Sequence, residues 1–76
     1  MGRAEVYIRR LGWKVVRVRS QGDTARIELP PDQLREFVIT VDLPQLVAAF
    51  QEFGFSYVTL DLEGFASGKL NRVLGV

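Results

Sequence analysis

Apolar positions along this chain recur first at helical spacing and then at a period of two, which predicts a helix followed by strands. The helical stripe consists of Ala4, Tyr7, Ile8 and Leu11. It predicts an amphipathic helix over about residues 3–11, and Gly12 follows where a left-handed residue would end it. Lys14–Arg19 alternates valines with basic residues, which predicts a strand that buries Val16 and Val18.

Residues Thr24 to Leu29 alternate in the same way, so a β-hairpin is expected after the turn Ser20-Gln21-Gly22-Asp23. A two-residue loop at Gln21-Gly22 predicts that Arg19 lies opposite Thr24 and Arg17 opposite Arg26. One face of this hairpin is then predicted to carry Arg17, Arg19, Arg26 and Glu28.

The second half of the chain predicts further helices and one strand. Pro30-Pro31 ends the hairpin and starts a helical turn, and Asp42 is the expected N-cap of a longer helix that ends at Gly54 with positive φ. The stripe of this longer helix consists of Leu43, Leu46, Val47, Phe50 and Phe53. Residues 55–63 predict a third strand with Asp61 and Glu63 on its outer side, and Ser67 is the expected cap of a short closing helix.

These elements predict one small α+β domain, residues 1–76, in the order α-β-β-α-α-β-α. The expected sheet is three-stranded and mostly antiparallel, a hairpin plus a third strand, with helices on one face. A crossover that skips one position would place the arginine strand in the centre. Asp61 and Glu63 would then flank the arginines opposite Arg26 and Glu28.

The amino-acid composition limits the kinds of catalysis and metal binding that the chain can support. The 76 residues hold ten Lys and Arg against nine Asp and Glu, a net charge of +1, and neither Cys nor His. Thiol and imidazole catalysis and the zinc sites that use these residues are excluded, so activity of the chain alone is not expected. A nearly neutral chain is not expected to bind nucleic acid or membranes generally, and the absence of a long apolar run predicts a cytoplasmic protein.

The arginine strand suggests a binding site. Arg17 and Arg19 share one strand side next to Arg26, and planar guanidinium groups without a carboxylate between them favour an anion, phosphate first. A solvated strand surface with a salt-bridge network explains the same pattern and stays open. Glu5, near the start of the first helix, is explained equally well by the helix dipole.

Blocks of residues along almost the whole chain resemble the C-terminal region of LarE-type proteins. These are ATP-dependent sacrificial sulfur transferases of the adenine nucleotide α-hydrolase (PP-loop) superfamily, which build the thiocarboxylates of the nickel-pincer cofactor. The blocks include Val16-Arg17-Val18-Arg19, Gly22-Asp23, Ala25-Arg26-Ile27-Glu28-Leu29-Pro30-Pro31, Gly54-Phe55 and Tyr57-Val58-Thr59-Leu60-Asp61-Leu62-Glu63-Gly64-Phe65. The resemblance implies that Arg17 and Arg19 form a phosphate or anion site, and that Glu5 and Glu28 belong to an acidic cluster for a divalent metal ion or the substrate.

The family's N-terminal ATPase domain, its Ser-Gly-Gly-x-Asp-Ser pyrophosphate loop and its sacrificial cysteine have no counterpart in these residues. We therefore expect a binding and assembly module that holds phosphate, works with a separate PP-loop ATPase subunit, and forms a homo-oligomer. The alternative is a self-associating interaction domain that kept the fold and lost the chemistry. RNA binding is not expected, because the sheet face carries carboxylates and lacks a pair of stacking aromatic residues.

Overall fold

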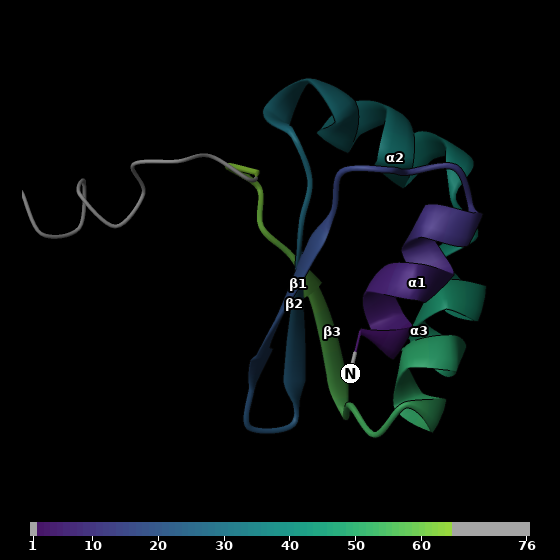
Figure 1. The fold of residues 1–76 in the computed structure, drawn as a ribbon, viewed down its shortest axis with the longest axis vertical. Coiled ribbons are helices and arrows are strands. Elements are labelled where there is room, and N and C mark those ends of the chain that lie inside the picture. Colours follow the sequence, from purple (N-terminus) through teal and green to yellow (C-terminus); the bar gives the residue numbers. More distant parts are fainter. Residues whose placement is uncertain (1, 65–76) are drawn as a thin grey trace, which may run out of the picture.

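A computed structural model describes residues 2–64 and shows an α+β fold with helices packed on a three-stranded sheet (Figure 1). In chain order the elements are α1 (Arg3–Arg10), β1 (Arg17–Gln21), β2 (Thr24–Glu28), the short 3-10 helix η1 (Pro31–Gln33), α2 (Leu34–Thr40), α3 (Leu43–Glu52) and β3 (Tyr57–Leu60). This order matches the predicted α-β-β-α-α-β. The predicted closing helix, with Ser67 as its cap, lies outside the described residues.

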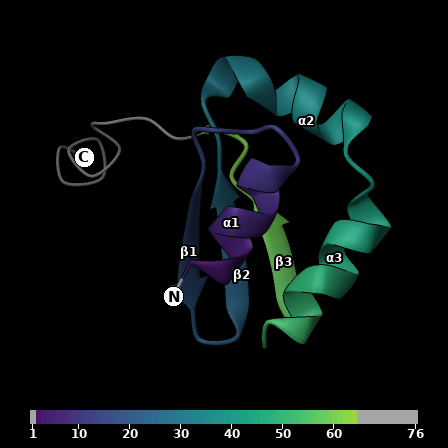
Figure 2. The same cartoon turned by 45° about the vertical axis from the view of Figure 1, so that its right-hand side comes forward.

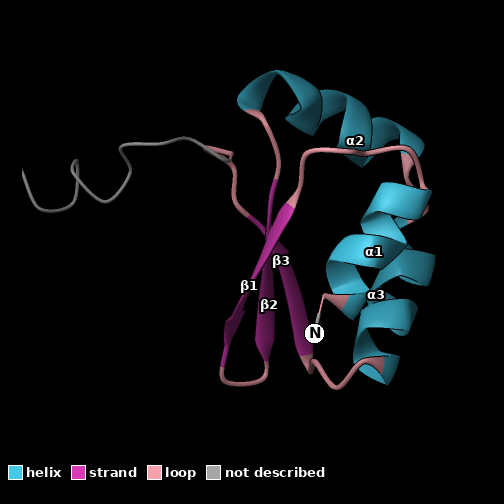
Figure 3. Ribbon diagram, viewed as in Figure 1, coloured by secondary structure: helices cyan, strands magenta, loops and turns pink. Residues whose placement is uncertain are grey.

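The helices α1 and α3 lie on one face of the sheet, whereas α2 lies across one end of it (Figures 2 and 3). Between the two layers is the core, whose largest fully buried side chains are Ile8, Ile27, Leu29, Phe37 and Phe50. The opposite sheet face is not covered by any element of residues 2–64. Alternate residues of β2 therefore face different surroundings, since Ala25 and Ile27 are buried on the helix side and Arg26 faces the other way.

The predicted first helix is confirmed with nearly the expected bounds. Ala4 and Ile8 are its buried residues, and Glu5 lies in its first turn. Gly12 has φ 110°, as expected for a residue that turns the chain after a helix. Leu11 belongs to the predicted stripe but remains 47% exposed, because it lies beyond the last helical residue.

The predicted register of the hairpin is wrong by two residues. The loop is Gly22-Asp23 rather than Gln21-Gly22, so Arg17 lies opposite Glu28 and Arg19 lies opposite Arg26. Gly22 has φ 61° while no residue other than glycine has positive φ in the described chain, which suits a two-residue hairpin loop with glycine first. A shift of two leaves every side chain on its predicted face. The strand also starts later than predicted, at Arg17 instead of Lys14.

The predicted sheet order is also wrong. The observed order is β1-β2-β3, so the arginine strand β1 is at an edge and β2 is central. β3 runs parallel to β2, which makes the sheet mixed rather than mostly antiparallel. The physical reason is burial: β2 contributes Ala25 and Ile27 to the core, and the connection through α2 and α3 returns β3 directly beside it.

The connection to β3 follows the sequence closely. Asp42 caps α3, because its Oδ1 accepts a hydrogen bond of 3.2 Å from the N–H of Gln45. Gly54 follows α3 with φ 109°, which confirms the predicted helix-ending conformation. β3 is shorter than the predicted strand over residues 55–63. Among residues 2–64, no helix has the length and apolar character needed to cross a membrane.

Candidate functional site: the charged face of the sheet

The charged face is the sheet surface opposite α1 and α3. Its members are Arg17 and Arg19 from β1, Arg26 and Glu28 from β2, and Asp61 directly after β3. They share this surface because side chains alternate along each strand and Val18, Ala25 and Ile27 point toward the helices. The structure thus brings the predicted arginines together with Glu28 on one side of the sheet.

Glu28 is the centre of this face. Only 4% of the residue is exposed, and it is the buried charged residue of the described chain. Its Oε1 lies 3.5 Å from Nε of Arg19, and its Oε2 lies 3.2 Å from Nη2 of Arg26. A buried carboxylate is costly unless cations compensate it, so Glu28 needs both arginines and in turn fixes where they lie.

Arg26 lies between two carboxylates. Its Nη2 faces Glu28, and its Nε lies 4.0 Å from Oδ2 of Asp61. This Nε is buried and has no hydrogen-bond partner among residues 2–64. Oδ2 of Asp61 is beyond hydrogen-bond distance, so Arg26 keeps one buried N–H donor without an acceptor within residues 2–64.

Asp61 is held in place by backbone contacts. Its N–H donates to the carbonyl of Ile27 at 2.9 Å, which continues the pairing of β3 with β2 by one residue. Its Oδ1 accepts a hydrogen bond of 2.9 Å from the N–H of Glu63. Glu63, which was predicted to flank the arginines together with Asp61, thus helps to orient Asp61 through its backbone N–H.

Glu5 lies elsewhere. Its Oε2 accepts a hydrogen bond of 2.9 Å from the N–H of Val18, and its Oε1 lies 3.7 Å from Nη2 of Arg9. Glu5 is thus at the outer edge of β1 on the helix side, whereas Glu28 is on the charged face. No group of three or more Asp or Glu side chains within residues 2–64 is placed to hold a metal ion.

The arrangement offers anion binding through partly neutralised guanidinium groups. The side chains of Arg19 and Arg26 are 47% and 39% exposed, so water or a ligand reaches them from the solvent side. Arg17 lies directly opposite Glu28 across the hairpin. Three arginines against the two carboxylates Glu28 and Asp61 leave this face with a positive balance, although one much smaller than the arginines alone suggest.

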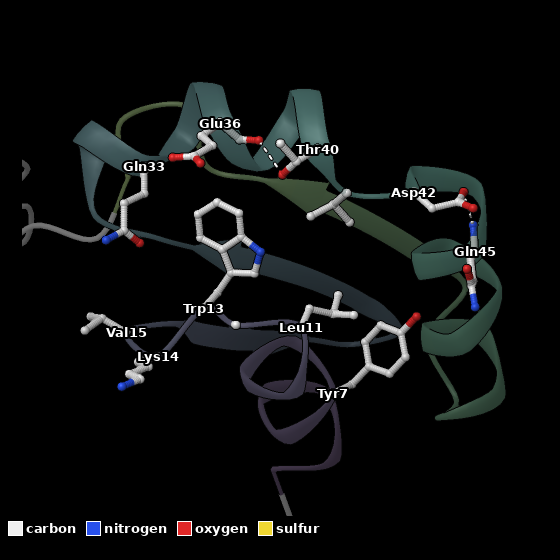
Figure 4. A pocket seen from close by; sticks show the side chains of 12 residues that line it. Tyr7, Leu11, Trp13, Lys14, Val15, Gln33, Glu36, Thr40, Asp42 and Gln45 are labelled. Atoms are coloured by element: carbon white, nitrogen blue, oxygen red, sulfur yellow. Dashed lines mark hydrogen bonds between the residues drawn. The ribbon is translucent and has the colours of Figure 1, made fainter.

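A groove lies between the end of α1 and α2, and it was not predicted from the sequence (Figure 4). This groove has a volume of about 840 Å³, and Trp13 lies at its centre with Tyr7, Leu11 and Gln45 along its sides. The ring of Trp13 packs edge-on against Phe37 at 5.2 Å between centroids. Trp13 thus packs against the core as a partly buried side chain, and the groove beside it has no local signal in the sequence.

Comparison with known proteins gives two relatives, whereas no known family model matches the chain. The chain is 66% identical over 74 residues to the uncharacterized protein slr1717 of Synechocystis sp., covering 97% of this chain and 28% of that protein. It is 48% identical over 71 residues to pyridinium-3,5-bisthiocarboxylic acid mononucleotide synthase of Lactiplantibacillus plantarum, covering 93% of this chain and 25% of that protein. The chain thus spans about a quarter of the length of the curated relatives that it matches.

Proposed function

We propose that this chain, which is homologous to the C-terminal part of LarE-type sulfur transferases, is a binding and assembly module that holds a phosphate group on its charged face. The name of the Lactiplantibacillus relative says that its product is a mononucleotide, and a mononucleotide carries a phosphate. A homologous region with clustered arginines is a suitable place to bind such a group, because guanidinium forks match phosphate oxygens in geometry and charge.

The observation that carries the proposal is the arrangement around Glu28. This buried carboxylate holds Arg19 and Arg26 at 3.5 Å and 3.2 Å, so the two guanidinium groups are ordered before a ligand arrives. Preorganised donors lose less conformational entropy on binding than flexible ones. Arg17 and Arg19 would contact the phosphate, and Arg26 would contribute the Nε–H that has no acceptor within the described chain.

The sulfur-transfer chemistry itself would take place elsewhere. The sequence contains no cysteine to donate sulfur. In this proposal a separate PP-loop ATPase subunit activates the substrate, and the present chain holds the phosphate end of that substrate. Purification of the tagged chain from its source cell, followed by mass spectrometry, should recover such an ATPase. Recovery of the chain without any PP-loop protein would contradict this part of the proposal.

The phosphate site is tested by thermal unfolding in inorganic phosphate. A ligand at about 100 times its dissociation constant stabilises the folded state by roughly 2.7 kcal/mol, which raises the midpoint. The double variant Arg17→Ala with Arg19→Ala should lose this rise.

The matched control is Arg10→Ala with Arg35→Ala, which removes the same charge from two exposed positions on α1 and α2. This control should respond to phosphate as the parent protein does. If both double variants lose the rise, phosphate acts through net charge, and if neither does, the charged face is not the site.

A second candidate function, self-association without chemistry, is favoured by a different observation. Ile39 on α2 and Leu62 after β3 are 73% and 83% exposed. Large exposed apolar side chains are features of surfaces that associate with another chain. A protein that self-associates but shows no phosphate-dependent stabilisation would support this candidate over the first.

A further inference from the structure

The outer edge of β1 has backbone groups that point away from the sheet. The pair Gln21 and Thr24 closes the two-residue hairpin loop, and antiparallel pairs alternate between exchanging hydrogen bonds and not doing so. Val18 and Ser20 fall on the non-exchanging positions, so their N–H and C=O groups face outward. The hydrogen bond from the N–H of Val18 to Glu5, at 2.9 Å, agrees with this assignment.

One backbone group of this edge, the N–H of Val18, already has an acceptor in Glu5. Its carboxylate occupies the place that the carbonyl of a neighbouring strand would take on the N–H of Val18. The C=O of Val18 and both backbone groups of Ser20 remain directed outward, and Ser20 is exposed. An extended segment can therefore pair with Ser20 and continue toward Val18.

A groove runs from this edge beneath the first turn of α1. It has a volume of about 840 Å³, and the charged residues along it are Arg3, Arg9, Arg17 and Glu5. Three arginines against one glutamate give the groove a positive balance. Phe53 and Phe55, both half-buried, provide apolar surface at its far end.

We propose that this edge groove binds an extended acidic segment of a partner protein by strand addition to β1. The outward groups of Ser20 and Val18 would pair with the backbone of the segment, and its acidic side chains would lie on the helix side, toward Arg3. Main-chain pairing would supply affinity, and the charges would select acidic segments over basic ones.

Charge argues against a second copy of this chain as the occupant. If two β1 edges paired antiparallel through Val18 and Ser20, Arg19 of one copy would lie opposite Arg19 of the other. Like charges directly opposite each other destabilise a pair of strands. Each copy would also bring its own positively charged groove to the same contact.

The test is an amide NMR titration with a blocked seven-residue peptide that alternates glutamate and valine, starting and ending with glutamate. The amides of Val18 and Ser20 should shift, and a peptide with lysine in place of glutamate should not bind. Arg3→Glu should weaken binding by about tenfold or more, since it reverses a charge beside the segment. Arg10→Glu, the same reversal on the same helix but away from the groove, should leave the affinity within about twofold.

Strand addition has its own controls. Ser20→Pro removes an outward N–H at an edge position without removing a ladder hydrogen bond, so it should fold and lose binding. A peptide N-methylated at alternate residues should lose binding to the parent protein, which keeps the test valid if Ser20→Pro does not fold. Equal binding of the methylated peptide, the same shifts with inorganic phosphate alone, or concentration-dependent shifts of Ser20 without peptide would each overturn the proposal.

Discussion

The carboxylate of Glu28 and the guanidinium of Arg26 lie on the same face of β2 with 3.2 Å between Oε2 and Nη2. They are two residues apart, the spacing that puts neighbouring side chains on one side of a strand. The same carboxylate contacts Arg19 on the adjacent strand. Arg19 and Arg26 are direct cross-strand partners of like charge, a pairing that is destabilising by itself. Glu28 contacts both guanidinium groups and therefore compensates their repulsion.

This relationship predicts an asymmetry between two substitutions. Arg26→Met removes one of the cations that contact the 4%-exposed Glu28, and should cost about 2–3 kcal/mol in the free energy of unfolding. Glu28→Gln should cost less, about 1 kcal/mol, because Arg19 and Arg26 are partly exposed and water can solvate them. Urea unfolding of both variants measures the difference.

Arg10→Met is the control for loss of an exposed arginine and should change the free energy of unfolding by less than about 0.5 kcal/mol. If Glu28→Gln were the more destabilising of the two main substitutions, the arginines would depend on the carboxylate more than it depends on them. The account of Glu28 as a buried charge in need of cations would then be wrong.

Alanine substitutions at Gly54 and Gly64 are expected to differ in their cost to stability. Both have positive φ, 109° and 81°, so alanine is strained at either position. A Cβ on Gly54 would meet nothing within 4 Å, whereas a Cβ on Gly64 would lie 2.6 Å from the carbonyl oxygen of Leu29. Gly54→Ala should therefore cost about 1–2 kcal/mol, from backbone strain alone, and Gly64→Ala about 3 kcal/mol or more.

Thermal or urea unfolding of the two alanine variants tests this directly. Equal losses of stability would mean that the chain after Asp61 moves away from Leu29 at little cost. That result would contradict a fixed position for Gly64 against the end of β2.

Side-chain alternation in the sequence was enough to place Arg19, Arg26 and Glu28 on one face. The register was predicted wrongly because Gln21-Gly22 and Gly22-Asp23 are both plausible two-residue loops by composition. They differ in whether Gly22, with its positive φ, is the second or the first residue of the loop. Because the error was an even number of residues, the face was right while every cross-strand pair was wrong. The contact of Glu28 with Arg19 depends on three-dimensional register and could not be read from the sequence.

The local sequence pattern also could not predict that β1 is an edge strand of the sheet. Hydrophobic spacing says which side of a strand is buried, but both a central and an edge strand can have one buried side. Val18 is half-buried, whereas Ala25 and Ile27 are fully buried, and this difference in burial distinguishes the edge from the centre. The role of Glu5 was missed for the same reason, since its acceptor position exists only because β1 is an edge.

The last prediction is that the protein is not a monomer in solution. A domain of 76 residues buries a smaller fraction of its surface than a larger domain does and gains little stability from its core without a disulfide, and this chain has no cysteine. Several large apolar side chains are exposed in the described part, including Val15 at 51%, Ile39 at 73% and Leu62 at 83%. Association should bury such side chains rather than join two charged faces, where arginines would repel unless an anion lay between them. Light scattering over a dilution series measures the mass: a species above 8.6 kDa that dissociates on dilution is expected, and Ile39→Lys should shift the dissociation to higher protein concentration. A constant mass of 8.6 kDa at high concentration would mean that the core of a single chain is sufficient.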